Sequence, residues 1–322
     1  RYLMSKPSFQ TVLAALGDET TAFPNRYLPL FSDLTPADVS ALGKQWPNLA
    51  KKRKRTLLNK LVELYQNDTL LSFEALSASL LNDPDEQIRA DALRLLAESE
   101  NTHLLPRLTQ LAENDSSPEV RVQAAQVLSR FVELGELDEI PAETRQMVEE
   151  SLLRVARAES AEVQRAAVEA LSFSSRPEVD TLIQHAFSLH DPKWVASALL
   201  AMGRSANTQW EEAVLARLDD PHDDIRRAAV QAAGELRLES ARQFLFDLLE
   251  EEEDNATFIA GIWALSQIGG EEVRITIQSL LDEAEDDDMI EFLEDALDNL
   301  DLTDQMNSFD LLAIDPDDEL DK

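Results

Sequence analysis

Residues 220–236 have the sequence DPHDDIRRAAVQAAGEL, which joins a helix-start signal to a helix rich in small residues. Asp220-Pro221 supplies an acidic turn residue and a proline, which the first turn of a helix tolerates because an N–H there has no helical partner. Ile225 is an apolar position, and Ala229 follows four residues later on the same helix face. The stretch therefore predicts a helix that a neighbouring helix can approach closely.

The same pattern recurs along the chain. An acidic or proline-containing turn precedes each copy, and its first anchor positions are Ile88, Val120, Val163, Trp194, Ile225, Thr257 and Met289. These positions are 32, 43, 31, 31, 32 and 32 residues apart. A constant period of this length predicts stacked helix pairs, because neither helix can bury its apolar face alone. The long interval holds about eleven extra residues, and we place an insertion at about 133–143.

A second helix is expected after each first helix. The predicted ranges, all with apolar residues at three-to-four spacing, are 103–113, 142–158, 177–189, 208–218, 240–252 and 271–283. Gly203, Gly234 and Gly269 fall where first helices are expected to stop. We therefore predict an all-α fold, a solenoid of stacked helix pairs whose repeat array spans residues 83–300.

Three segments carry a family resemblance. They are Asp83-Pro84 with Ile88-Arg89 and Ala92, Asp115 with Val120-Arg121 and Ala124, and Asp220-Pro221 with Ile225-Arg226, Ala229 and Gly234. The pattern resembles the HEAT-like repeats of the phycobilisome-lyase type, and the whole chain is similar to uncharacterised bacterial HEAT-repeat proteins. The resemblance implies a HEAT-like solenoid, which is a right-handed α-α superhelix. It implies no single activity, because the family includes scaffolds, adaptors and a few enzymes.

The two ends of the chain depart from the repeat. Residues 1–82 read as a divergent helical N-terminal cap, since a solenoid must cover its first apolar face. Within them Thr35-Pro36 begins a short helix, and a longer one covers about 49–66. Residues 301–322 alternate acidic and apolar side chains, and we expect an acidic disordered tail there.

The chain is strongly acidic, with a formal net charge of −34. Residues 1–82 hold 10 Lys/Arg and 7 Asp/Glu, whereas residues 247–322 hold 2 and 26. Neither a nucleic acid nor an anionic membrane is therefore the expected partner. The charge also argues against a DNA-repair glycosylase of the kind built on similar repeats. A basic protein or peptide is the expected partner.

The expected compartment is the cytoplasm. The sequence has no cysteine, which fits a reducing environment. It contains no run of about 18 apolar residues and no visible secretory pattern.

One basic cluster stands out. It consists of Lys51, Lys52, Arg53, Lys54 and Arg55, at the start of a helix whose leucines face inward. Three interpretations stay open: a solvated helix face, a nucleic-acid patch, or a receiver for an acidic segment from a partner or from the chain's own tail. The cluster and the tail residues Phe309, Leu311 and Leu312 are the candidate partner contacts.

Acidic and basic residues also recur in register. We call the set Asp83, Arg89, Asp115, Arg121, Asp220 and Arg226 the Asp–Arg ladder. Each arginine follows an apolar anchor and lies six positions after an aspartate. A charged binding row is one interpretation. We favour ion pairs within and between repeats that tie the turns together.

The sequence predicts no catalytic, cofactor-binding or metal-binding site. The histidines are His103, His185, His190 and His222. None precedes a glutamate, so the His-Glu ligand pairs of HEAT-type di-iron hydroxylases are missing, and none has the spacing of a zinc-protease helix. Capping or surface roles are expected for them. A calcium loop, a phosphate loop and a nucleophile elbow are likewise absent from the sequence.

Two functions are consistent with these observations. The leading hypothesis is a non-enzymatic protein–protein interaction scaffold or adaptor, whose second helices line a concave acidic surface that holds a basic protein or peptide. The alternative, suggested by the resemblance, is a bilin-lyase-like or chaperone-type protein acting on a chromophore or client protein. The tryptophans Trp46, Trp194, Trp210 and Trp263 are mostly core candidates, with one or two expected to contact a partner.

Overall fold

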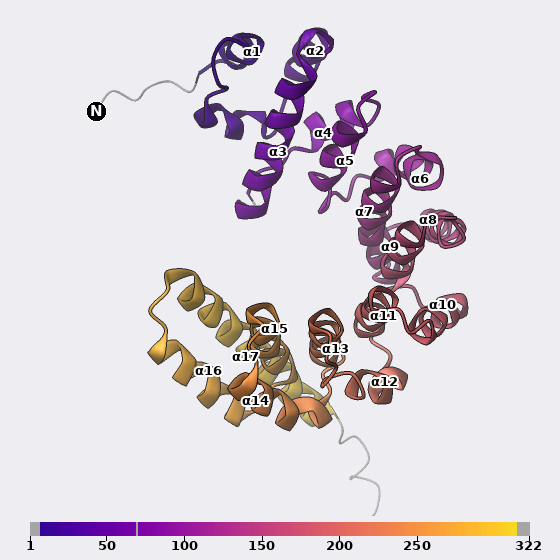
Figure 1. Ribbon diagram of the computed structural model, residues 1–322, viewed down its shortest axis with the longest axis vertical. Coiled ribbons are helices and arrows are strands. Elements are labelled where there is room, and N and C mark those ends of the chain that lie inside the picture. The colour runs from indigo at the N-terminus through magenta and orange to yellow at the C-terminus, as the bar shows by residue number, and fades with distance from the viewer. Residues whose placement is uncertain (1–6, 69, 314–322) are drawn as a thin grey trace, which may run out of the picture. The chain divides into compact units, whose positions relative to one another are not determined.

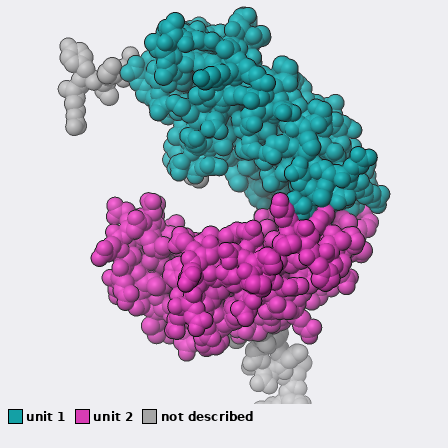
Figure 2. Space-filling model, viewed as in Figure 1, with its two compact units in different colours: residues 1–174 teal, residues 175–322 magenta. Residues whose placement is uncertain are grey.

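The computed structural model describes residues 7–68 and 70–313, with side chains to residue 306 (Figure 1). Every regular element of these residues is a helix, which confirms the predicted all-α fold. The chain divides into two compact units, residues 1–174 and 175–322 (Figure 2). No helix in the described part of the chain is both long and apolar enough to cross a membrane.

The first unit begins with helices that lack the repeat. They are α1 (Phe9–Gly17), α2 (Pro36–Gln45), α3 (Lys51–Asn67) and α4 (Glu74–Leu80), with 3₁₀ turns at Asn25–Phe31 and Trp46–Asn48. Thr35 caps α2, because its side chain accepts from the Asp38 N–H while the Asp38 carboxylate accepts from the Thr35 N–H. Phe31 and Phe73 are fully buried among these helices.

Helix pairs follow in the same unit. They are α5 (Glu86–Arg94), α6 (Leu105–Asn114), α7 (Pro118–Glu136), α8 (Ala142–Val155) and α9 (Ala161–Leu171). The first helices α5, α7 and α9 pack in sequence, and α6 and α8 pack on each other as a second layer. Ile88, Val120 and Val163, three of the predicted anchor positions, are completely buried.

The second unit repeats this arrangement. Its helices are α10 (Pro177–Ser188), α11 (Pro192–Arg204), α12 (Glu211–Leu215), α13 (Asp223–Glu235), α14 (Arg242–Glu251), α15 (Asn255–Ile268), α16 (Glu271–Glu283) and α17 (Asp287–Ala313). The first helices α11, α13, α15 and α17 pack in sequence, and the second helices pack beside them (Figure 1).

α11 and α13 end one residue after Gly203 and Gly234, close to the predicted positions, but neither glycine is the left-handed residue of the stop. Both lie inside helices, and the left-handed stops come later, at Ala206 (φ 51°) and Arg237 (φ 52°). The two glycines instead permit close helix packing. A Cβ on Gly203 would lie 2.8 Å from the Cα atom of Ala232 in the next first helix. Gly269 is the stop that the sequence predicts, with a φ of 82°.

The extra residues at about 133–143 mostly lengthen a helix. α7 runs for 19 residues to Glu136, and only a short connection to Pro141 separates it from α8. Gly135 is buried in α7 against the side chain of Arg145. The insertion is therefore a longer first helix followed by a turn.

The acidic tail is not disordered where it begins. α17 continues to Ala313, so residues 301–313 are helical. Leu300 and Thr303 are buried, and Arg274 of α16 pairs with Asp301 at 2.7 Å and Asp304 at 2.9 Å. These contacts explain the difference, because α16 gives the segment a surface on which to pack. Residues 314–322 lie outside the described residues.

Candidate functional site

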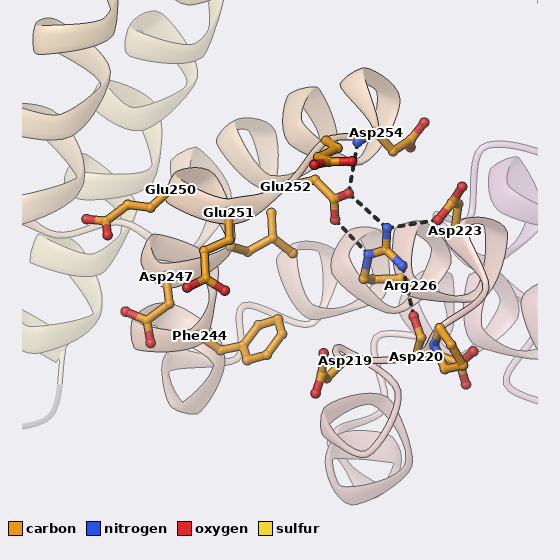
Figure 3. A pocket seen from close by; sticks show the side chains of 13 residues that line it. Asp219, Asp220, Asp223, Arg226, Phe244, Asp247, Glu250, Glu251, Glu252 and Asp254 are labelled. Atoms are coloured by element: carbon orange, nitrogen blue, oxygen red, sulfur yellow. Dashed lines mark hydrogen bonds and ion pairs between the residues drawn. The ribbon is translucent and has the colours of Figure 1, made fainter.

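An open acidic groove of about 1020 Å³ lies within the second unit. One side is the turn that leads into α13, and the other is α14 with the turn that follows it (Figure 3). Its lining consists of Asp219, Asp220, Pro221, Asp223, Arg226, Phe244, Asp247, Leu248, Glu250, Glu251, Glu252, Glu253 and Asp254. Nine of these thirteen residues carry carboxylates, and we call the whole set the acidic groove.

Two equivalent turns shape the acidic groove. In the first, Oδ1 of Asp220 accepts the backbone N–H of His222 at 3.0 Å. In the second, Oε1 of Glu252 accepts the N–H of Asp254 at 2.9 Å, and Asp254 in turn accepts the N–H of Thr257 to cap α15. An acid two residues before the helix cap therefore fixes each turn, and stacking of the repeats brings the two turns together.

Arg226 is the one cation of the lining. It donates from Nε to Oε2 of Glu252 at 2.6 Å and from Nη2 to Oε1 at 2.8 Å. It also reaches Asp223 and the backbone carbonyl of Asp220, each at 2.9 Å. The hydrogen bond from Arg226 lowers the pKa of Glu252. The charge of Arg226 is thus compensated inside the fold.

Four carboxylates of the acidic groove are exposed and unpaired. Asp219, Glu250, Glu251 and Glu253 have no hydrogen-bond or ion-pair partner among the described residues. Phe244 of α14, only partly exposed, adds an aromatic ring to the lining (Figure 3). The acidic groove therefore presents uncompensated negative charge beside an apolar contact. The second helices of the repeats were expected to line an acidic surface, and α14 is one of them. In the acidic groove, however, the turns supply most of the acidic residues.

The basic cluster is largely engaged within the cap and the first repeat. Arg55 donates to both carboxylate oxygens of Asp85, at 2.9 Å and 2.8 Å, and Nζ of Lys51 lies 3.2 Å from the same carboxylate. The hydrogen bond from Arg55 lowers the pKa of Asp85 to about 2. Asp85 is thus an acidic partner for the cluster, supplied by the turn that begins α5.

Arg53 binds backbone carbonyls at the C-terminal end of α1 and just after it. It donates to four backbone carbonyls, those of Ala15, Leu16, Asp18 and Thr21, at 2.7–3.2 Å. Nζ of Lys54 lies 5.4 Å from the ring centroid of Trp46, and Lys52 is exposed without a partner among the described residues. Docking of the tail on this cluster stays a prediction, since the side chains of Phe309, Leu311 and Leu312 lie outside the described ones.

The Asp–Arg ladder contains both direct pairs and carbonyl contacts. Arg89 pairs with Asp115, one repeat ahead, and donates to the carbonyl of Asp83 at 2.9 Å. Arg226 makes the equivalent contacts with Glu252 and Asp220. Arg121 instead donates to the carbonyl of Ala112 at 3.1 Å, without an acid among the described residues. Asp115 and Glu252 each lie two residues before the cap of the next first helix. The equivalent residue ahead of Arg121 is Ala158, two residues before the cap of α9, so Arg121 has no acid there to pair with.

Glu252 pairs with Arg226 as Asp115 pairs with Arg89, and the sequence did not predict this role. It lies 26 residues after Arg226, the same separation as between Arg89 and Asp115. A search for acids six positions before each arginine cannot find it. The sequence signal that could have identified Glu252 is an acidic residue two positions before the cap of the next first helix.

The histidines occupy surface and capping positions. Nδ1 of His222 lies 3.0 Å from Oδ1 of Asp220, at the start of α13. His103, His185 and His190 are exposed. Within the described ranges, no group of three acidic or histidine side chains is placed to hold a metal ion.

The tryptophans differ in exposure. Trp46 is buried and donates from Nε1 to Oδ2 of Asp83 at 2.7 Å. Trp194 and Trp210 are half-buried. Trp263 is exposed.

Comparison with known proteins gives one family match and several similar structures. The model of HEAT repeats matches residues 73–142 and 211–298. No curated protein sequence matches the chain. Escherichia coli YibA is 15% identical, with a TM-score of 0.44 over 87% of this chain and 97% of its own. The complex of CpcE and CpcF of phycocyanin lyase from Nostoc sp. PCC7120 is 17% identical, with a TM-score of 0.49 over 70% and 94%. An engineered protein is 16% identical, with a TM-score of 0.39 over 92% of each chain.

The family match agrees with the repeat seen in sequence and structure. Its first stretch covers α4 to α7 and ends at the first residue of α8. Its second stretch contains the whole acidic groove and ends within α17. The chain thus contains HEAT repeats, at residues 73–142 and 211–298.

Proposed function

We propose that this chain is a non-enzymatic interaction scaffold that holds a basic segment of a partner protein in the acidic groove. One observation carries the proposal. Asp219, Glu250, Glu251 and Glu253 are exposed and unpaired around an open groove, while its one arginine is already compensated. Such a surface attracts lysine and arginine side chains.

The geometry favours a polypeptide segment as the occupant. The carboxylates line a groove of about 1020 Å³ and do not converge on one point. Several cationic side chains spaced along a segment match that arrangement. The ring of Phe244 offers an apolar contact, and aromatic contacts often supply much of the binding energy at protein interfaces.

The acidic groove is also preorganised. Asp220 and Glu252 hold its two turns by hydrogen bonds to backbone N–H groups, and Arg226 joins one turn to the other. A rigid surface loses less conformational entropy when a partner binds. Binding through exposed carboxylates is screened by salt, so the affinity should fall steeply with ionic strength.

The proposal is tested by site-specific cross-linking and charge reversal. A photo-cross-linking residue at position 251 should capture a defined protein in the source cell, and the same residue at position 283 should not. Affinity is then measured with that purified partner. The triple variant Glu250→Lys, Glu251→Lys and Glu253→Lys should weaken binding at least about tenfold, because the new lysines repel the cations that the carboxylates attract.

A matched control carries the same charge change elsewhere. Asp282, Glu283 and Glu285 are also exposed and unpaired among the described residues. Their reversal to lysine should leave the affinity within about twofold, since they lie outside the acidic groove. Equal losses for the two triple variants would contradict the proposal. A visible absorption band on the purified protein would instead favour the lyase-type alternative.

A further inference from the structure

A second pocket opens on the first-helix layer of the second unit. It has a volume of about 370 Å³ and draws its lining from four helices, with Arg204 of α11, Glu235 of α13, Ile259 and Trp263 of α15, and Phe292 of α17 among its residues. It shares no lining residue with the acidic groove. We call it the Trp263 pocket. Its volume lies at the small end of the range of ligand sites, which suits a single side chain.

The indole of Trp263 is an accessible wall of this pocket. The residue keeps 38% of its accessible surface, whereas Trp46 keeps 6%. Its ring lies 6.3 Å from the ring of Phe292, with the planes inclined by 37°. An exposed indole face attracts cations through its quadrupole, and tryptophan is the strongest aromatic partner for them.

The carboxylate of Glu235 supplies negative charge at the same place. It lies against Gly203, where any Cβ would overlap with Oε2 of Glu235. No hydrogen bond to this carboxylate exists among the described residues. Desolvation raises the pKa of Glu235, while the charge of Arg204 acts in the opposite direction. Glu235 is exposed and no described group donates to its carboxylate, so this carboxylate can accept a hydrogen bond from an incoming cation.

We propose that the Trp263 pocket binds one arginine side chain of a partner protein, with its aliphatic part along Ile259 and its guanidinium between Trp263 and Glu235. Arginine fits better than lysine, because its planar head stacks on an aromatic face and also donates to a carboxylate. The net charge of −34 favours the same sign of partner. The site is independent of the acidic groove, so either proposal can fail alone.

The test uses the full chain with ¹⁵N-labelled tryptophan and two matched probes. Nα-acetyl-arginine amide carries the guanidinium, and Nα-acetyl-citrulline amide has nearly the same shape without the charge. The indole N–H signal of Trp263, assigned by its disappearance in Trp263→Phe, should shift on titration with the arginine probe. The citrulline probe should bind about tenfold more weakly, since it cannot form a charge-assisted hydrogen bond.

Two further variants separate the possible results. Glu235→Gln keeps the size of the side chain beside Gly203 and should weaken the arginine probe about tenfold. The triple variant Glu250→Lys, Glu251→Lys and Glu253→Lys should leave its affinity unchanged. An indole signal that does not move, equal affinity for the two probes, or full affinity in Glu235→Gln would each overturn the assignment.

Discussion

Arg89 and Asp115 join two consecutive repeats through a two-pronged ion pair. Nε of Arg89 lies 2.9 Å from Oδ2 of Asp115, and Nη2 lies 2.7 Å from Oδ1. The side chains keep only 11% and 6% of their accessible surface. Asp115 also accepts the N–H of Ser117, one residue before the start of α7. One helix is thereby connected to the turn that begins the next first helix.

Substitution of Arg89 should therefore destabilise the folded protein. Arg89→Met is expected to lower the free energy of unfolding by about 3 kcal/mol, because it leaves the Asp115 carboxylate buried without its cation. Arg121→Met is the control, since Arg121 loses only a hydrogen bond to a carbonyl, worth about 1 kcal/mol. Urea unfolding of the two variants measures the difference. Equal losses would show that the ion pair adds nothing.

Asp85 should make stability depend on pH. Its pKa is lowered from 3.8 to about 2 by the hydrogen bond from Arg55, so the charged form stabilises the fold. Asp85→Asn keeps a good helix-capping residue but removes the charge. The variant should lose about 1–2 kcal/mol at pH 7, a value reduced for solvent screening. The difference should be constant above about pH 5 and vanish as the pH falls from about 4 to about 2. A difference that persists at pH 2 would argue against this origin.

Gly234 should not tolerate alanine. An added Cβ would lie 2.6 Å from the Cα atom of Ala264, so two first helices would have to separate. Gly234→Ala should destabilise the protein by about 2 kcal/mol despite the better helix propensity of alanine. Gly43→Ala is the matched control, because a Cβ there meets no atom within 4 Å. That change should stabilise the protein by about 0.5–1 kcal/mol. Thermal unfolding of the two variants measures both effects.

Glu235 should oppose stability when it is ionised. Local desolvation raises its pKa although the side chain is exposed, so the folded protein holds this proton more tightly than the unfolded chain does. Its favourable contribution is present at low pH and is lost as the pH rises through the folded-state pKa. Glu235→Gln should therefore match the wild-type melting temperature near pH 4 and exceed it at pH 8. A variant less stable at pH 8 would indicate that the carboxylate has a stabilising partner.

The repeat architecture could be predicted from the sequence because the residues that start each helix lie next to one another in the chain. Asp191-Pro192 predicts the start of α11, and in the structure Asp191 accepts the N–H groups of Lys193 and Trp194. The roles of Gly203 and Gly234 were not accessible, since they depend on residues of the next repeat. A small residue near the end of a helix suits both a stop and a close helix contact.

The acidic groove could be predicted only as a general surface property. The charge counts indicate an acidic segment at residues 247–322, but the groove forms where the turn at Asp220 meets the turn at Glu252 one repeat later. The basic cluster was the opposite case. Its charge is conspicuous in sequence, yet Arg53 and Arg55 are engaged inside the first unit because folding brings α1 and the start of α5 to them. A cluster of charged residues in a sequence does not by itself show that their side chains are free to bind a partner.

The unpaired acids of the groove have one more consequence. Asp220 and Glu252 hold the turns in shape, whereas Asp219, Glu250, Glu251 and Glu253 support no other described part of the fold. In the proposed function, the residues that would contact a partner are therefore different from the residues that hold the turns. If the acidic groove binds a partner as proposed, substitution of the second set would change the charge that the groove accepts, while the first set would keep the turns in place.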